Sequence, residues 1–231
     1  MLGWLLLALP FLLGGRRRTT PPRGPALPPA SDAWEVLARP AIWSLGTSST
    51  PRCNGRLAVV PAVTANWGTQ IRDGVKAPLV WGWTAPGQRA VADRYAGRLV
   101  ADVELKSWSG KASELAEAEY LAARCPAVTS HGFVAPSLKG ALKKFAAAGR
   151  VAIPQVYDSD RSREPRAFVR QCVDSYDRAG FTRILPLLGI VAGVDYTEAW
   201  IDECQKMGVP FHLWSTGRLT GNNEPAICAL V

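Results

Sequence analysis

Two acidic residues lie at the end of the most strand-like stretch of the chain. The run 99–105 reads LVADVEL, and its acids, Asp102 and Glu104, are two positions apart. Because side chains alternate between the two faces of a strand, both carboxylates are expected on the same face. Two like charges at close range raise the pKa of one of them. A carboxyl group with a raised pKa can act as a general acid while its ionised neighbour stabilises positive charge, so the pair indicates an enzyme.

The elements that must position this pair are short β-type runs that alternate with helical patterns from residue 41 onward. Such alternation is typical of parallel strands joined by crossover helices. The predicted strands are 41–46, 57–63, 78–84, 99–105, 127–135, 151–157, 183–190 and 210–216. The predicted helices are 87–96, 112–124, 138–148, 165–179 and 196–207, several of which end at a glycine.

Eight strands with interleaved helices predict an α/β fold, a compact (β/α)8 TIM-like barrel with abbreviated early helices. An open doubly wound sheet, with the first two runs not being strands, is the structural alternative. The sequence contains no glycine-rich phosphate loop that would support the alternative. In a barrel, chemistry takes place at the carboxyl ends of the strands.

Polar and aromatic residues gather at those predicted strand ends. They are Trp81 and Trp83; Asp102, Glu104 and Trp108; His131; Gln155, Tyr157 and Asp158; and Trp214. Taken in order, the fourth strand ends in D-x-E, the sixth in Q-x-Y-D, and the eighth in a tryptophan.

This order resembles the barrel glycosidases that cleave N-acetylhexosamine polymers, namely the family 18 (chitinase-like) and family 25 (lysozyme-like) enzymes. Both families have a D-x-E on the fourth strand. Family 18 adds a tyrosine followed by an acid or amide on the sixth strand and a tryptophan on the eighth. Here Leu99, Val100 and Ala101 stand where family 18 has further aspartates, and Gln155 stands where it usually has methionine. The first strand also lacks the aspartate of family 25.

The resemblance implies a role for each matching residue. Glu104 would protonate the glycosidic oxygen, and Asp102 would orient the 2-acetamido group of the sugar as that group attacks the anomeric carbon. Tyr157 would hydrogen-bond the same acetamido group, so no second catalytic carboxylate is needed. The substrate-binding set would be Trp214, Trp81, Trp83, Gln155, Asp158 and Trp108, with aromatic rings as the surface on which a sugar stacks.

Structural interpretations stand beside these functional ones. Asp102 and Glu104 also fit a solvated strand end paired with Lys106 or an arginine. Tyr157 and Trp214 also fit simple packing, and the charged stretch 158–164 fits an exposed loop. The two histidines of the chain, His131 and His212, have no acidic or cysteine neighbour at ligand spacing, so we expect each to be a satisfied residue of the barrel.

Composition and charge narrow the class of protein. The chain has 231 residues with 48% hydrophobic content, enough for a substantial core, and a formal net charge of +8. That charge favours an anionic partner and does not choose among nucleic acid, membrane lipid and an acidic cell-wall polymer. No nucleic-acid-binding signature is present, so no specific nucleic-acid partner is expected.

The five cysteines are widely separated and odd in number. They form no C-x-x-C pair or Cys/His cluster, so neither a zinc site nor a disulfide framework is predicted, and no cofactor is expected. Cys125, Cys172 and Cys204 fall in helix-like segments and are expected to be small buried hydrophobes.

The N-terminal part of the chain is organised differently from the rest. Residues 1–18 combine an apolar run, shorter than a comfortable membrane span, with three arginines that follow it. This order fits a membrane anchor, an export signal or an arm that docks on another protein. Residues 19–30 read as a proline-rich linker, and the folded domain is expected at 31–231. The expected location is membrane-associated or exported, with a component of a larger assembly as the alternative.

The leading hypothesis is therefore a glycoside hydrolase-like barrel that acts on a polysaccharide containing N-acetylhexosamine, such as peptidoglycan or a chitin-like polymer. The alternative is a non-catalytic structural or carbohydrate-binding protein that keeps the barrel as a scaffold, because fold does not settle function. A metal-dependent hydrolase using Asp102, Glu104 and Asp158 is a third interpretation, but no histidine ligand joins them.

Overall fold

A computed structural model describes residues 30–44, 53–65, 70–157, 163–190, 194–215 and 228–229. The apolar segment 1–18 and nearly all of the predicted linker lie outside the described residues, as does Asp158. The helices of the described part include none that is long and apolar enough to cross a membrane.

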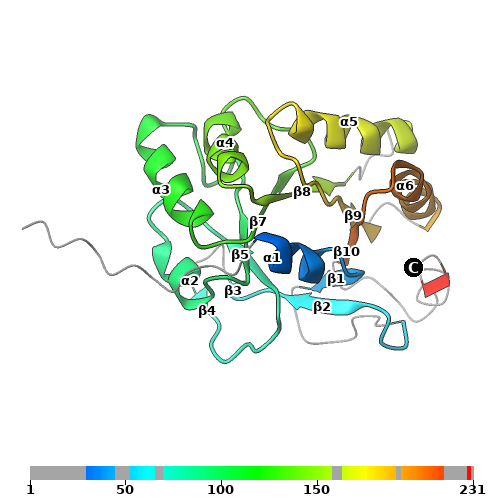
Figure 1. Cartoon of the computed structure of the whole chain (residues 1–231), viewed down its shortest axis with the longest axis horizontal. Coiled ribbons are helices and arrows are strands. Elements are labelled where there is room, and N and C mark those ends of the chain that lie inside the picture. The colour runs from blue at the N-terminus through cyan, green and yellow to red at the C-terminus, as the bar shows by residue number, and fades with distance from the viewer. Residues whose placement is uncertain are drawn as a thin grey trace, which may run out of the picture.

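Eight parallel strands form the centre of the molecule (Figure 1). They are β1 (Ala41–Ser44), β2 (Ala58–Pro61), β5 (Val80–Trp83), β6 (Leu99–Asp102), β7 (Ala127–His131), β8 (Val151–Val156), β9 (Leu187–Gly189) and β10 (His212–Ser215). Their hydrogen-bonded order is β2-β1-β10-β9-β8-β7-β6-β5. Just beyond β2, a parallel bridge between Ala62 and Trp81 brings the two outer strands together, and the N–H of Val63 donates to the Trp81 carbonyl at 2.8 Å. The sheet is therefore a nearly closed barrel.

Six helices accompany the strands in the described residues. They are α1 (Ala30–Leu37), α2 (Arg89–Arg94), α3 (Ala112–Ala122), α4 (Lys139–Ala147), α5 (Pro165–Asp177) and α6 (Val194–Met207). Each predicted strand and helix corresponds to one of these elements, with shorter strands than expected, so the (β/α)8 prediction is confirmed. The doubly wound alternative is wrong, since both of the first two runs are strands of the barrel. Helix α1 and a hairpin of β3 (Thr64–Ala65) and β4 (Gln70–Ile71) had not been predicted.

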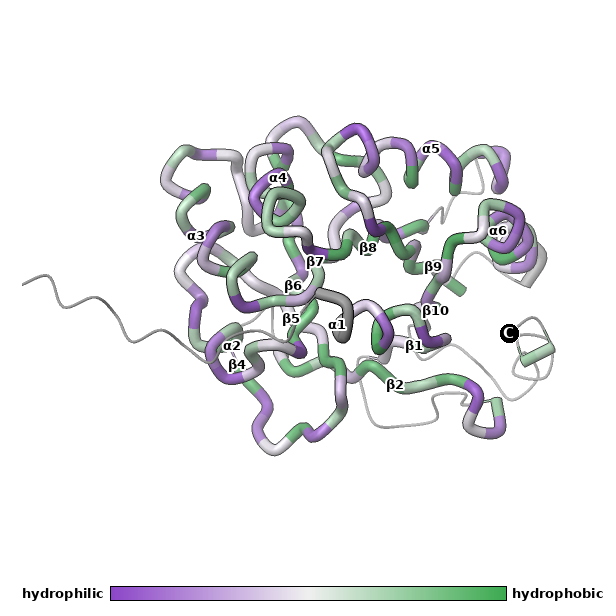
Figure 2. The backbone as a smooth tube through the Cα atoms, viewed as in Figure 1, coloured by the Kyte–Doolittle hydropathy of each residue, from purple (hydrophilic) through white to green (hydrophobic). Residues whose placement is uncertain are grey.

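The alternation of side chains along the strands separates two kinds of core. Residues such as Val100 and Ile153 point into the barrel, while neighbours such as Ala101 and Ala152 face the helices. Figure 2 shows β8 and β9 as largely hydrophobic, whereas α4 and α5 alternate between hydrophilic and hydrophobic positions. This is the pattern of strands buried on both faces and helices buried on one.

Helix α1 covers the amino end of the barrel, where Figure 1 shows it across the middle of the ring of strands. Its last residue, Leu37, is fully buried with the barrel-interior side chains. The indole N–H of Trp43 donates to Nδ1 of His212 at 2.9 Å, so the Nε2 of His212 bears the proton and lies 2.7 Å from the Leu37 carbonyl and 3.1 Å from that of Arg39. Burial lowers the pKa of His212 to about 4, so the ring is neutral at pH 7. His212 is thus the satisfied histidine that the sequence predicted.

Helix α3 is fixed at its start by a buried carboxylate. Glu114 accepts hydrogen bonds from the backbone N–H groups of Ser109 and Gly110 at 3.0 and 2.8 Å, and from the Ser109 hydroxyl at 2.7 Å. Burial alone would raise the pKa of Glu114, but these bonds outweigh it and hold the pKa below its ordinary value. The ionised carboxylate therefore anchors the loop that leads from the barrel rim into α3.

One disulfide joins Cys53 to Cys228, 175 positions later in the chain. The sequence had indicated no disulfide framework, and that prediction is wrong for this pair. Cys53 packs in the cluster that lies between the barrel and helices α5 and α6. Cys125, Cys172 and Cys204 are buried and free, as expected.

Candidate functional site

The carboxyl end of the barrel holds an open pocket with a cavity volume of about 100 Å³. Its lining consists of aromatic and acidic side chains together with one amide and one leucine: Trp43, Trp81, Trp83, Asp102, Glu104, Gln155, Tyr157, Leu187 and Trp214. The structure thus brings together seven of the nine predicted site residues, from strands β5, β6, β8 and β10.

The two acids reach the pocket by the expected alternation. Asp102 is the last residue of β6 and points into the barrel, and Glu104 follows it on the same side. The amide nitrogen of Gln155 lies 3.2 Å from an oxygen of Asp102 and 3.2 Å from an oxygen of Glu104, and donates to both. One amide therefore ties the two carboxyl groups together.

The two acids are in different surroundings. Asp102 is 3% exposed, whereas Glu104 is only half-buried. Burial, and then the nearby charge of Glu104, raise the pKa of Asp102 well above its ordinary value, against the opposing effect of the Gln155 hydrogen bond. The sequence argument linked the raised pKa to the general acid, whereas in the structure the raised pKa belongs to Asp102, the deeper residue and the one expected to have the supporting role. Glu104 is the carboxyl group that faces the open part of the pocket.

Aromatic rings form the rest of the wall. Trp43 stacks on Trp81, with ring centroids 5.9 Å apart and planes at 24°, and Trp214 meets Trp81 edge-on at 5.2 Å. Tyr157 and Trp214 are nearly parallel, with centroids 6.4 Å apart and planes at 23°. Flat apolar faces of this kind bind the apolar faces of sugar rings.

Tyr157 is placed against the backbone of β9. A Cβ atom at Gly189 would lie 2.6 Å from the Cδ1 atom of the Tyr157 ring, closer than real contacts allow, so the glycine makes room for the ring. Burial, followed by the charges of Asp102 and Glu104, raises the pKa of the Tyr157 hydroxyl well above its ordinary value. The hydroxyl is therefore a protonated donor on the acidic side of the pocket.

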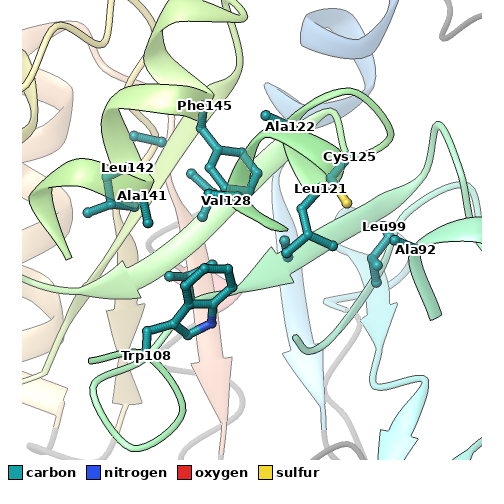
Figure 3. Packing of buried hydrophobic residues seen from close by; sticks show 14 of the residues in the cluster. Ala92, Leu99, Trp108, Leu121, Ala122, Cys125, Val128, Ala141, Leu142 and Phe145 are labelled. Carbon is teal, nitrogen blue, oxygen red and sulfur yellow. The ribbon is translucent and has the colours of Figure 1, made fainter. Parts of the chain in front are cut away.

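Trp108, which the sequence analysis placed in the substrate-binding set, does not line the pocket. It is 1% exposed and packs in the cluster between the barrel and helices α3 and α4, where Figure 3 shows it with Leu121, Leu142 and Phe145. Its indole N–H donates to the carbonyl of Thr84 at 2.6 Å. The loop after β6 places this tryptophan between the barrel and the helices, so it is part of the core.

His131 ends β7, next to the acids, and its Nε2 accepts a hydrogen bond from the backbone N–H of Leu105 at 3.2 Å. Through this hydrogen bond, the imidazole of His131 fixes the backbone of Leu105, which directly follows Glu104. The interpretation of His131 as a satisfied barrel residue agrees with that contact. The predicted contact of Asp158 with substrate concerns a residue outside the described part of the chain.

Two lining residues, Trp43 and Leu187, had not been predicted. Trp43 is near the end of the first strand, so the strand-end rule that selected Trp81 would also have selected it. Leu187 begins β9 and is fully buried in the barrel interior, where the sequence gives no functional signal.

Within the described residues, no group of three or more histidine, cysteine or acidic side chains is arranged to hold a metal ion. In comparisons with known proteins, the chain matches no protein-family model and no curated protein.

Proposed function

We propose that this protein is a glycoside hydrolase that cleaves a polysaccharide containing N-acetylhexosamine. The observation that supports this most strongly is the pair Asp102 and Glu104, joined by Gln155 and facing an open pocket walled by aromatic rings. The lining residues that the structure describes are aromatic, acidic, amide and aliphatic side chains.

In the proposed reaction, Glu104 donates its proton to the glycosidic oxygen as the bond from that oxygen to the anomeric carbon breaks. The carbonyl oxygen of the 2-acetamido group attacks the anomeric carbon from the other face and forms a cyclic oxazolinium ion. Glu104, now ionised, then takes a proton from the water that opens this ring. The sugar itself supplies the nucleophile, so one catalytic acid is sufficient.

Asp102 and Tyr157 have the supporting roles. Burial and the charge of Glu104 raise the pKa of Asp102, and a carboxyl oxygen of Asp102 would accept a hydrogen bond from the acetamido N–H. Tyr157 offers a donor on the same side of the pocket. The two groups would hold the acetamido group in the attacking orientation, while Trp214 and Trp81 provide the surface for the sugar ring.

The proposed partner is an envelope polysaccharide, and the proposed location is exported or membrane-associated. The net charge of +8 suits an acidic polymer. The Cys53–Cys228 disulfide fits an oxidising compartment outside the cytosol. The apolar segment 1–18 would provide the export signal or anchor.

The test is an assay of the purified full chain against peptidoglycan and chitin oligosaccharides, with product analysis. We expect Glu104→Gln to lower kcat by about 100-fold or more, because the general acid is removed without loss of shape. Glu119→Gln is the control, since Glu119 is an exposed residue of α3 that pairs with Lys144 at 3.1 Å. Equal activity of the wild type and Glu104→Gln would refute the role of the acid. Oligosaccharide binding without any hydrolysis would instead support the non-catalytic scaffold.

A further inference from the structure

We propose that Gln155 is a positioning residue whose side-chain amide fixes the relative arrangement of the Asp102 and Glu104 carboxyl groups and sets the proton content of the pair. The structural part of this proposal depends only on the contacts below. Its catalytic consequence rests on the proposed function.

The contact requires a long side chain. Gln155 lies on β8 and both acids belong to the end of β6, with β7 between them. Two strand spacings amount to about 10 Å of separation between backbones. Gln155 is paired in register with His131 of β7 and reaches over that strand to place its amide nitrogen 3.2 Å from each carboxyl group. An asparagine would be one methylene too short for this span.

The chemistry of the amide fits two acidic partners. A primary amide nitrogen has two N–H groups and can donate to two acceptors at once. Each of these bonds favours the ionised form of its partner. Gln155 therefore opposes the burial and charge repulsion that raise the pKa of Asp102, and does so without adding a charge to the pocket.

The other titratable groups around the pair come from three parts of the chain. Tyr157 directly follows β8 and is a protonated phenol on the side of both acids. His131 of β7 accepts a hydrogen bond at Nε2 from the Leu105 N–H. Tyr176 of α5 lies behind β7 and donates to the His131 carbonyl at 2.6 Å. The Gln155 amide, by contrast, donates to both carboxyl groups.

The experiment is a pH titration of the carboxyl carbons of Asp102 and Glu104 by NMR on the full chain without substrate, in the wild type and in Gln155→Met. Methionine has a similar length and no N–H, so the variant removes the donors and keeps the volume. We expect the apparent pKa of Asp102 to rise by about one pH unit, since each hydrogen bond to a charged group is strong. Gln205→Met is the control, because Gln205 is an exposed residue of α6 away from the pocket. An unchanged titration in Gln155→Met would overturn the proposal.

A second measurement needs no variant at position 155. In the wild type, the side-chain amide resonances of Gln155 should change across the same pH range in which Asp102 titrates. Amide resonances that stay constant through that range would also overturn the proposal, whether or not Gln155→Met folds.

Activity measurements separate this proposal from the proposed function. With a hydrolysed substrate, Gln155→Met should lower kcat by about 10- to 100-fold with a smaller change in KM, because misplacement by about 1 Å costs about 100-fold in rate. The low-pH limb of its pH profile should move upward with the pKa of the pair. A wild type without activity but with the expected titration shift would refute the hydrolase and support the positioning role. An active wild type with no titration shift in Gln155→Met would support the hydrolase and refute the positioning role of Gln155.

Discussion

Gly189 offers a direct test of how tightly the site is built. The substitution Gly189→Ala adds one methyl group on the inner face of β9, where its Cβ would lie 2.6 Å from Cδ1 and 3.2 Å from Cε1 of Tyr157. Normal contacts between carbon atoms are about 3.5–4.0 Å, so the ring must move by about 1 Å. The backbone of Gly189 has no positive φ, so alanine adds steric contact without backbone strain.

The expected result has two parts. Moving a group by about 1 Å at a reacting centre lowers the rate by about 100-fold, so kcat on N-acetylhexosamine oligosaccharides should fall by roughly that factor. Overpacking should also lower the free energy of unfolding by about 1–3 kcal/mol. Steady-state kinetics and thermal unfolding of the full chain measure the two effects.

The matched control is Gly140→Ala in α4. There the new Cβ meets only the tip of a flexible Leu115 side chain, at 2.9 Å, and the site lies outside the pocket. Its kcat should equal that of the wild type. If Gly189→Ala also retained wild-type kcat and stability, the placement of Tyr157 against β9 would be refuted.

Three further outcomes follow from the structure. Glu114→Gln should lower the free energy of unfolding by about 1–3 kcal/mol at pH 7. Because the pKa of Glu114 is depressed in the folded state, this difference should be present above the unfolded-state pKa, about 4.3, and vanish as the pH falls through the folded-state pKa. A difference that does not depend on pH in denaturant titrations would contradict this prediction. Trp108→Phe should lower Tm and leave KM unchanged, whereas Trp214→Phe should raise KM; a raised KM for Trp108→Phe would restore its predicted contact with substrate. Reduction of the Cys53–Cys228 bond should cost about 2–5 kcal/mol, seen as a lower Tm with reductant, and an unchanged Tm would show that the bond does not restrain the unfolded chain.

The barrel was predictable because its signals are local and repeated. Apolar runs of strand length, helical periodicity and terminal glycines each report on a few neighbouring residues, and eight repeats in order are hard to mistake. The hairpin of β3 and β4 was not predicted from the sequence, because two-residue strands contain no periodicity.

The site was predictable to the extent that it follows from alternation. Asp102, Glu104, Gln155 and Tyr157 meet because every second residue at a strand end faces the barrel axis. Trp108 lies in the core and not in the pocket, because the same rule says nothing about a residue in the loop that follows a strand.

The sequence could not predict properties that depend on how deeply a side chain is buried or on partners far apart in the chain. Which acid has the raised pKa follows from how far each side chain is buried, and sequence gives only their order. The Cys53–Cys228 bond joins residues 175 positions apart, with three buried cysteines as competing partners in the sequence. Only the assembled fold selects the pair.

The neutral imidazole of His212 links the pocket to the opposite end of the barrel. Trp43, which forms part of the pocket wall, donates to one nitrogen of His212, and the other nitrogen is bonded to the carbonyl of Leu37 at the end of α1. A ligand that presses on Trp43 therefore acts on the docking of α1, and a loosened α1 acts on the pocket by the same free energy. Protonation of His212 would set two N–H donors against each other, so this coupling should be lost as the pH falls through about 4. Helix α1 is thus thermodynamically linked to a pocket that none of its described residues lines.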